Sequence, residues 1–193
     1  MNKLESLKPY EVFKYFEEIC KIPHGSGDMD KISAFCVDFA KRHSLKFVCD
    51  NGKNVIIYKE GSKDLKNTEP IILQAHLDMV CEKTKDSTHN FETDPLTIYV
   101  EDGKVTAKDT TLGGDNGIAV AMALAVLEDS TIAHPPIEAL FTIDEETGMD
   151  GALALDMSLL KGKIGVNTQY PFKANFSASS CIISLNFKLP HTV

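Results

Sequence analysis

The stretch IILQAHLDMV, residues Ile71 to Val80, is a continuous apolar run whose second half carries a histidine and an aspartate two positions apart. Its residues Ile71 to Asp78 predict a strand buried on both faces of a sheet that is covered by helices, and hence a central strand of an α/β fold. Side chains two apart in a strand share a face, so His76 and Asp78 should point the same way. Inside a protein, such groups must be hydrogen-bonded, paired or bound to a metal.

The length and composition limit what kind of protein this is. With 193 residues and 43% hydrophobic content, the chain is long enough for one substantial domain or for part of a larger one. The net charge of −8 and the lack of a basic stripe argue against a nucleic-acid groove. Charged residues occur throughout the first 22 positions, which predicts neither a signal peptide nor a membrane anchor and indicates a cytoplasmic location.

The cysteines are odd in number and widely spaced, with no C-x-x-C pair. This pattern is typical of reduced thiols, and we expect them to be core residues. They are Cys20, Cys36, Cys49, Cys81 and Cys181.

Apolar spacing predicts the elements that surround the central strand. Two amphipathic helices should open the chain, one after Pro9 and one after Asp28, with the loop IPHGSGDMD between them. His24 in that loop is expected at the surface. Hairpin turns are predicted at Asp50 to Lys53 and at Asp102-Gly103.

The second half of the chain adds a buried helix and another buried strand. The helix should span Ile118 to Leu127, and the strand Ile137 to Ile143. No repeat or low-complexity linker separates these pieces, so the sequence predicts one α/β domain with a mixed central sheet flanked by helices.

Polar residues gather where these strands end and where the buried helix starts, the usual location of sites in α/β proteins. Asp115 stands just before the helix, and Glu145 and Glu146 directly follow the strand. Together with His76 and Asp78, they would repel one another at one sheet edge unless a divalent cation were bound. An imidazole with several carboxylates suits zinc, cobalt or manganese, and a bridging carboxylate suits a two-metal hydrolase.

Each member of this set also has a simpler interpretation. His76 and Asp78 could contact each other or solvent at a strand tip. Asp115 could be the N-cap of the helix, and Glu145 and Glu146 could be a solvated pair in a first helical turn. Their order and context together favour the metal site.

Three segments carry a resemblance to a known family. LQAHLDMV, TTLGGDNGIAVAMALAVLED and DEETGMDGALAL resemble, in order and spacing, the signatures of the aminoacyl-histidine dipeptidases. These are cytosolic two-zinc peptidases related to carnosinase, and the resemblance runs from about Leu7 to Thr168. It implies an aminopeptidase-like catalytic domain that binds two divalent ions, most simply zinc, with cobalt or manganese possible.

The resemblance also implies a role for each site residue. His76 would be a ligand of one zinc, with Asp78 orienting its imidazole. Asp115 would bridge both metals, and Glu146 would bind the second zinc. Glu145 would be the general base that takes a proton from the attacking water.

The family further implies a substrate and a backbone feature. Its members hydrolyse unblocked dipeptides, particularly Xaa-His, and neither a nucleic acid nor a membrane is expected as a partner. They dimerise through a lid domain that is absent here. The bond after the bridging aspartate, here Asp115-Asn116, would be a cis peptide.

The resemblance stops after Thr168. Gln169 stands where the family has a further aspartate ligand, so we expect residues 1–168 to be the N-terminal part of a catalytic domain that is incomplete at the C-terminus, and residues 169–193 to be a divergent tail. His191 lies too close in sequence to be the last histidine ligand. A translated frameshift and a truncated paralogue both remain open. We expect the incomplete chain by itself to show little or no hydrolysis. The alternative to a dipeptidase is a non-catalytic remnant that binds metal weakly or associates with an intact paralogue.

Overall fold

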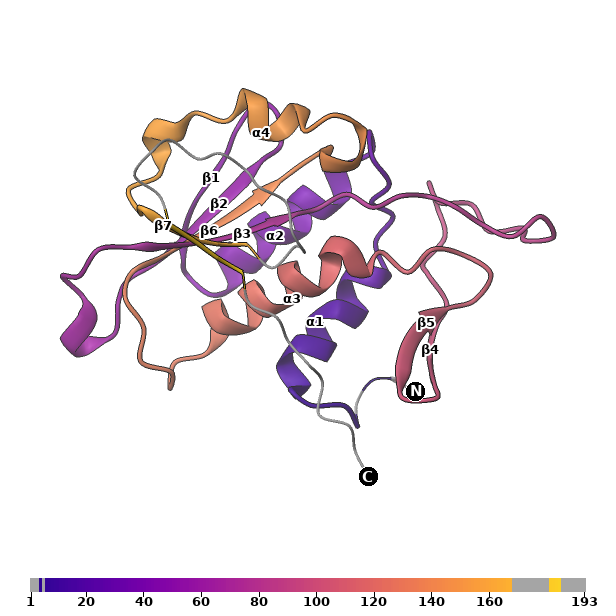
Figure 1. The fold of residues 1–193 in the computed structure, drawn as a ribbon, viewed down its shortest axis with the longest axis horizontal. Coiled ribbons are helices and arrows are strands. Elements are labelled where there is room, and N and C mark those ends of the chain that lie inside the picture. The colour runs from indigo at the N-terminus through magenta and orange to yellow at the C-terminus, as the bar shows by residue number, and fades with distance from the viewer. Residues whose placement is uncertain (1–3, 5, 168–180, 185–193) are drawn as a thin grey trace.

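A mixed sheet forms the centre of the protein (Figure 1), whose computed structural model describes residues 4, 6–167 and 181–184. In spatial order the strands are β1 (Lys46–Cys49), β2 (Val55–Lys59), β6 (Ile137–Thr142), β3 (Ile71–His76), β7 (Ile164–Asn167) and β8 (Cys181–Ser184). β1, β2 and β6 pair antiparallel, whereas β6, β3, β7 and β8 run parallel. The predicted mixed sheet with a central β3 is confirmed.

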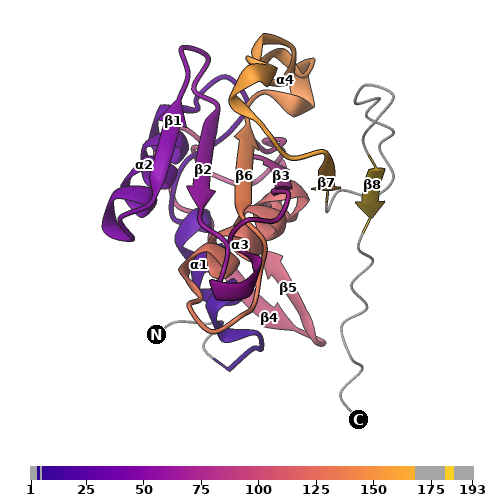
Figure 2. The same ribbon diagram turned by 90° about the vertical axis from the view of Figure 1, so that its left-hand side faces the viewer.

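Three helices cover one face of this sheet (Figure 2). They are α1 (Tyr10–Cys20), α2 (Asp30–Arg42) and α3 (Gly114–Glu128), close to the predicted positions. Their apolar residues share one core with strand residues that point to this face, such as Val55 and Ile57 of β2 and Ala139 and Phe141 of β6. The main core therefore lies between the helices and the sheet.

The opposite face of the sheet carries a smaller apolar layer. Ile56, Ile72 and Leu140 lie there because side chains alternate along each strand. The segment after β6 covers them with Leu155, Leu159 and Leu160. This segment contains η2 (Glu145–Thr147), α4 (Asp150–Ala154) and η3 (Met157–Leu159).

Both predicted hairpins are present. The first joins β1 to β2, and the second pairs β4 (Ile98–Glu101) with β5 (Lys104–Ala107) in a separate two-stranded sheet. Asp102 and Gly103 turn the second hairpin with φ of 50° and 72°, as the sequence predicts. The remaining short element is η1 (Lys63–Leu65), in the connection between β2 and β3.

His24 is buried, with 3% of its surface exposed, so its predicted place at the surface is wrong. Its loop packs beside the chain that leaves β3: the Met79 N–H donates to the His24 carbonyl oxygen at 3.2 Å. The His24 Nδ1 lies 2.5 Å from the carbonyl oxygen of Ile22. The imidazole is thereby satisfied locally while the loop is held against the end of the central strand.

The prediction that the cysteines are core residues is right for two of them and wrong for two. Cys20 and Cys36 are buried on α1 and α2. Cys49 and Cys81 are exposed, because Cys49 ends an edge strand and Cys81 begins the polar segment after β3. The side chain of Cys181 is outside the described part of the chain. Among the described residues, none of the helices has the length and apolarity needed to cross a bilayer.

Candidate metal centre

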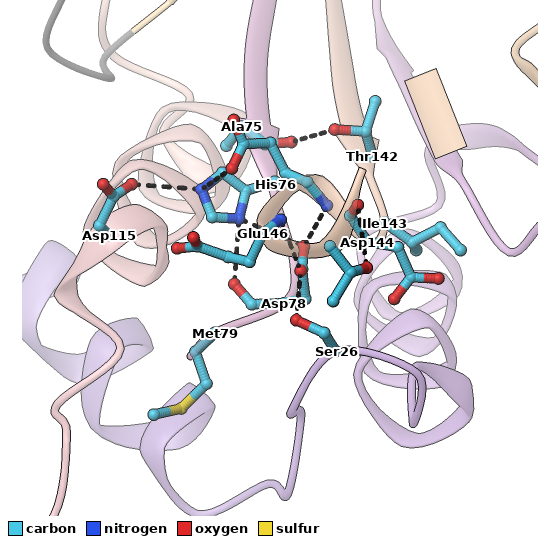
Figure 3. Close-up of polar contacts among 12 residues, drawn as sticks. Ser26, Ala75, His76, Asp78, Met79, Asp115, Thr142, Ile143, Asp144 and Glu146 are labelled. Atoms are coloured by element: carbon cyan, nitrogen blue, oxygen red, sulfur yellow. Dashed lines mark hydrogen bonds and ion pairs between the residues drawn. The ribbon is translucent and has the colours of Figure 1, made fainter. Parts of the chain in front are cut away.

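The three polar segments identified in the sequence meet at one edge of the sheet (Figure 3). β3 and β6 are parallel neighbours, so their carboxyl ends lie side by side and place His76 next to the turn that holds Glu146. α3 starts at the same edge and contributes Asp115. One ligand atom from each of these three side chains lies within 4.8 Å of the others.

His76 is the buried centre of the group, with a fully buried side chain. Its Nδ1 faces Asp78, 3.0 Å from the backbone oxygen and 3.3 Å from Oδ1. Its Nε2 faces two other carboxylates, 3.2 Å from Asp115 Oδ1 and 3.8 Å from Glu145 Oε2. Burial works to lower the pKa of His76, but the hydrogen bond and charge of Asp78, with Glu145 and Asp115, outweigh it and raise the pKa.

Asp78 follows β3, which ends at His76 and is two residues shorter than predicted. Its carboxylate accepts hydrogen bonds from Ser26 Oγ at 2.7 Å, from the Glu145 N–H at 3.0 Å and from the Glu146 N–H at 3.2 Å. Burial acts to raise the pKa of Asp78, but these bonds and the one from His76 outweigh it and lower the pKa to about 2. The ionised carboxylate therefore contacts both the imidazole and the backbone of the two glutamates.

Asp115 lies at the irregular start of α3, and 63% of its side chain is exposed. The N-cap of the helix is Gly113, with φ of 67° and no side-chain cap bond, so the N-cap interpretation of Asp115 is wrong. Asp115 itself has the non-helical φ of −88° and ψ of 108°. The Asp115-Asn116 bond is cis, as expected. The Asp115 carboxylate thus faces His76 instead of the helix end.

Glu145 and Glu146 lie in the single turn η2 directly after β6. Burial raises the pKa of Glu146, and the charges of Glu145, Asp115 and Asp78 act in the same direction against the opposing effect of His76. Four carboxylates around one imidazole make a strongly negative edge. This donor set is suited to a divalent cation.

Two residues of this region were not singled out from the sequence. Ser26 lies in the loop before α2 and bonds Asp78 across 52 positions, and Asn54 bonds both ends of the segment that contains η2. The Gly-Ser-Gly of the loop was a visible signal for Ser26. Nothing local marks Asn54. Gln169 and His191 lie outside the described residues.

A comparison with family models decides the class of protein. Residues 72–184, more than half of the chain, match the model of peptidase family M20/M25/M40. The chain belongs to this family. The matched region contains all five residues of the site, and the M20 chain described here has the α/β catalytic-domain fold of its homologues.

One curated relative of this M20 chain and one similar solved structure are named as dipeptidases. The chain is 41% identical over 168 residues to the cytosol non-specific dipeptidase of Escherichia coli (strain K12). The match covers 87% of this chain and 35% of that relative. The structure of aminoacylhistidine dipeptidase from Vibrio alginolyticus superposes with a TM-score of 0.83 at 42% identity, over 86% of this chain and 34% of that one. The chain thus spans about a third of the length of these relatives.

A more distant structure shares the fold alone. It is the YXEP protein of Bacillus subtilis, described as a dinuclear metal binding peptidase from the M20 family. Its TM-score is 0.53 at 12% identity, over 81% of this chain and 41% of that one.

Proposed function

We propose that this chain carries part of the metal centre of an M20 dipeptidase, with His76, Asp115 and Glu146 as ligands of divalent cations. The observation that supports this most directly is the approach of one imidazole nitrogen and two carboxylate oxygens to within 4.8 Å of one another. These atom types suit zinc, cobalt or manganese. Burial raises the pKa of Glu146, and the neighbouring carboxylates add to this effect, which a bound cation would oppose.

We propose that the arrangement takes part in holding two ions, most simply zinc. Asp115 has a largely exposed carboxylate beside His76 and could bridge, while His76 and Glu146 would each serve one ion. The bound ions would supply Lewis acidity and lower the pKa of a water toward ~7. The dinuclear description of the YXEP protein agrees with this proposal.

The chain's own residues would then act as follows. Asp78 orients the His76 imidazole by its contact with Nδ1, so that Nε2 points toward Asp115 and Glu145. Glu145 would accept a proton from the attacking water at its carboxylate and deliver that proton to the leaving amine. Its N–H bond to Asp78 keeps the carboxylate at the edge of the site.

The proposed substrates are dipeptides, especially Xaa-His, and the proposed location is the cytoplasm. The relatives named above support both, because one is a cytosol non-specific dipeptidase and another an aminoacylhistidine dipeptidase. A second candidate is a non-catalytic protein that binds metal weakly or associates with an intact paralogue. The exposed apolar side chains of Leu153 and Met157, 79% and 50% exposed, favour it.

Equilibrium dialysis with zinc or manganese, alongside an Xaa-His hydrolysis assay, tests these proposals. We expect Glu146→Gln to weaken metal binding at least about tenfold, and Glu145→Gln to remove whatever hydrolysis the wild-type chain shows while metal still binds. The matched control is Asp38→Asn, which removes a carboxylate from a surface ion pair with Lys41. Metal affinity that is the same in Glu146→Gln and the wild type would contradict the site. Weak metal binding without Glu145-dependent hydrolysis would favour the second candidate.

A further inference from the structure

The segment Ile143 to Gly151, which holds both glutamates, is fastened at both of its ends by one side chain from a distant hairpin. Asn54 follows the β1–β2 turn and is 1% exposed. Its Oδ1 accepts from the Ile143 N–H at 3.2 Å, and its Nδ2 donates to the Gly151 carbonyl oxygen at 2.9 Å. One buried amide therefore joins the start and the end of this segment.

Asn54 is itself held in place by its own turn. Asp50 accepts from the Asn54 backbone N–H at 2.9 Å and from its Nδ2 at 2.7 Å. The carboxamide thus has a fixed orientation, with its oxygen toward Ile143 and its nitrogen toward Gly151. Figure 2 shows this turn close to α4 at one end of the sheet.

The contact requires a glycine at its far end. A Cβ at Gly151 would lie 2.6 Å from Asn54 Oδ1 and 2.6 Å from the carbonyl oxygen of Ile143. Backbone and carboxamide can approach this closely only because residue 151 has no side chain.

Between the two ends, the segment is held from the other side. Asp78 accepts the N–H groups of Glu145 and Glu146, and the Gly27 N–H donates to Asp144 Oδ1 at 2.7 Å. These contacts fix the middle of the segment relative to β3 and to the loop before α2. Asn54 adds a side-chain bond at each of the two ends.

We infer that Asn54 is a positioning residue of the metal centre: by bonding Ile143 and Gly151 it sets where η2 presents Glu145 and Glu146 beside His76. Asn54 contacts neither the proposed metal nor the substrate, and it acts through the backbone of the segment. An amide suits this role because one side chain must accept at one end and donate at the other. The role of the two glutamates in this inference rests on the proposed function. The bracing of the segment by Asn54 does not.

The test uses the chain as it stands, with Asn54→Ala and a matched control, Ser33→Ala. Ser33 is buried and donates to the Lys53 carbonyl oxygen at 2.8 Å, so the control removes a hydrogen bond to the same turn without touching the segment. Amide hydrogen exchange read by mass spectrometry should be about tenfold faster over residues 143–151 in Asn54→Ala. Exchange over α1 and α3 should not change, and Ser33→Ala should leave residues 143–151 as in the wild type.

Exchange that rises equally over the whole chain, or not at all over residues 143–151, would overturn the inference. If Asn54→Ala does not fold, Gly151→Ala gives the same measurement, because its methyl group collides with the carboxamide from the other end. Equal exchange over residues 143–151 in Gly151→Ala and the wild type would also overturn the inference.

Metal binding separates this inference from the proposed function. Manganese affinity, followed by the loss of the free-ion signal in electron paramagnetic resonance, should fall about tenfold in Asn54→Ala and stay unchanged in Ser33→Ala. A wild-type chain that binds no manganese would count against the proposed function, while the exchange result still decides whether Asn54 braces the segment. Unchanged manganese affinity in Asn54→Ala, with faster exchange, would overturn the positioning role.

Discussion

Asp78 links two parts of the site that are far apart in sequence. It contacts the imidazole of His76 on one side and the backbone N–H groups of Glu145 and Glu146 on the other. Because the same carboxylate contacts both, a shift of Asp78 would move the imidazole and the glutamates together. Ser26 is the side chain that stabilises this carboxylate from outside the site.

Removal of the Ser26 hydroxyl should therefore be costly. Ser26→Ala leaves Asp78 Oδ2 without its 2.7 Å donor, and a lost hydrogen bond to a buried charge costs about 1–3 kcal/mol. We expect a loss of this size in the free energy of unfolding, measured by urea denaturation. Ser62→Ala removes two bonds with the His134 backbone away from the site, one donated at 3.2 Å and one accepted at 3.0 Å, and should cost less because neither partner is charged. Equal losses of unfolding free energy in the two variants would show that the bond to Asp78 contributes no more to stability than the bonds of Ser62.

At the scale of elements, α1 and α3 pack against each other on the helix-covered face of the sheet, and α3 carries Asp115 at its start. Gly117 lets them approach closely, since a Cβ there would lie 3.3 Å from Phe16 Cε2. Tyr15 of α1 is 1% exposed and donates from its hydroxyl to Glu128 Oε2 at the end of α3, at 2.7 Å. The hydrogen bond from Tyr15 lowers the pKa of Glu128.

This pair should make stability depend on pH in a predictable direction. A carboxyl group whose pKa is lowered on folding stabilises the fold above its unfolded pKa of about 4.3, and this contribution is lost as the pH falls through the lower folded value. Tyr15→Phe should cost about 1 kcal/mol of unfolding free energy at pH 7 and less below about pH 4. Urea denaturation at the two pH values measures the difference. The same cost at both values would contradict a contribution from ionised Glu128.

At the scale of the whole molecule, the two faces of the sheet are covered unequally. Among the described residues, three helices pack on one face, whereas the segment with α4 and η3 covers Ile56, Ile72 and Leu140 on the other. Beside this thinner layer, Leu153 is 79% exposed and Met157 is 50% exposed. Apolar side chains gathered in this way favour association with another surface.

We therefore expect the chain to self-associate at high concentration through this face. Leu153→Glu should reduce the apparent mass in light scattering, with a change in stability within about 0.5 kcal/mol because the side chain is 79% exposed. Ile132→Glu, at a 47% exposed position in the loop before β6, is the matched control and should not reduce association. A wild-type chain that stays monomeric over the same concentrations would show that this face does not mediate self-association.

Local patterns were enough to predict much of this protein. Apolar periodicity located α1, α2, both hairpins and the buried strands, because a helix or strand imposes its own period on the residues it buries. The five polar residues of the site were visible because each interrupts or ends an apolar run. Their convergence at one edge could be predicted from the rule that parallel strands end together.

By itself the sequence determined the elements and marked the residues of the candidate metal centre, and only the tertiary structure decided which side chains support them. The burial of His24, the exposure of Cys49 and the contacts of Ser26 and Asn54 all depend on segments that are distant in the chain. Alternation along a strand says which face a side chain takes, but not which segment covers that face. A hydrogen bond across 97 positions, such as that from Asn54 to Gly151, exists only after the sheet has brought its partners together.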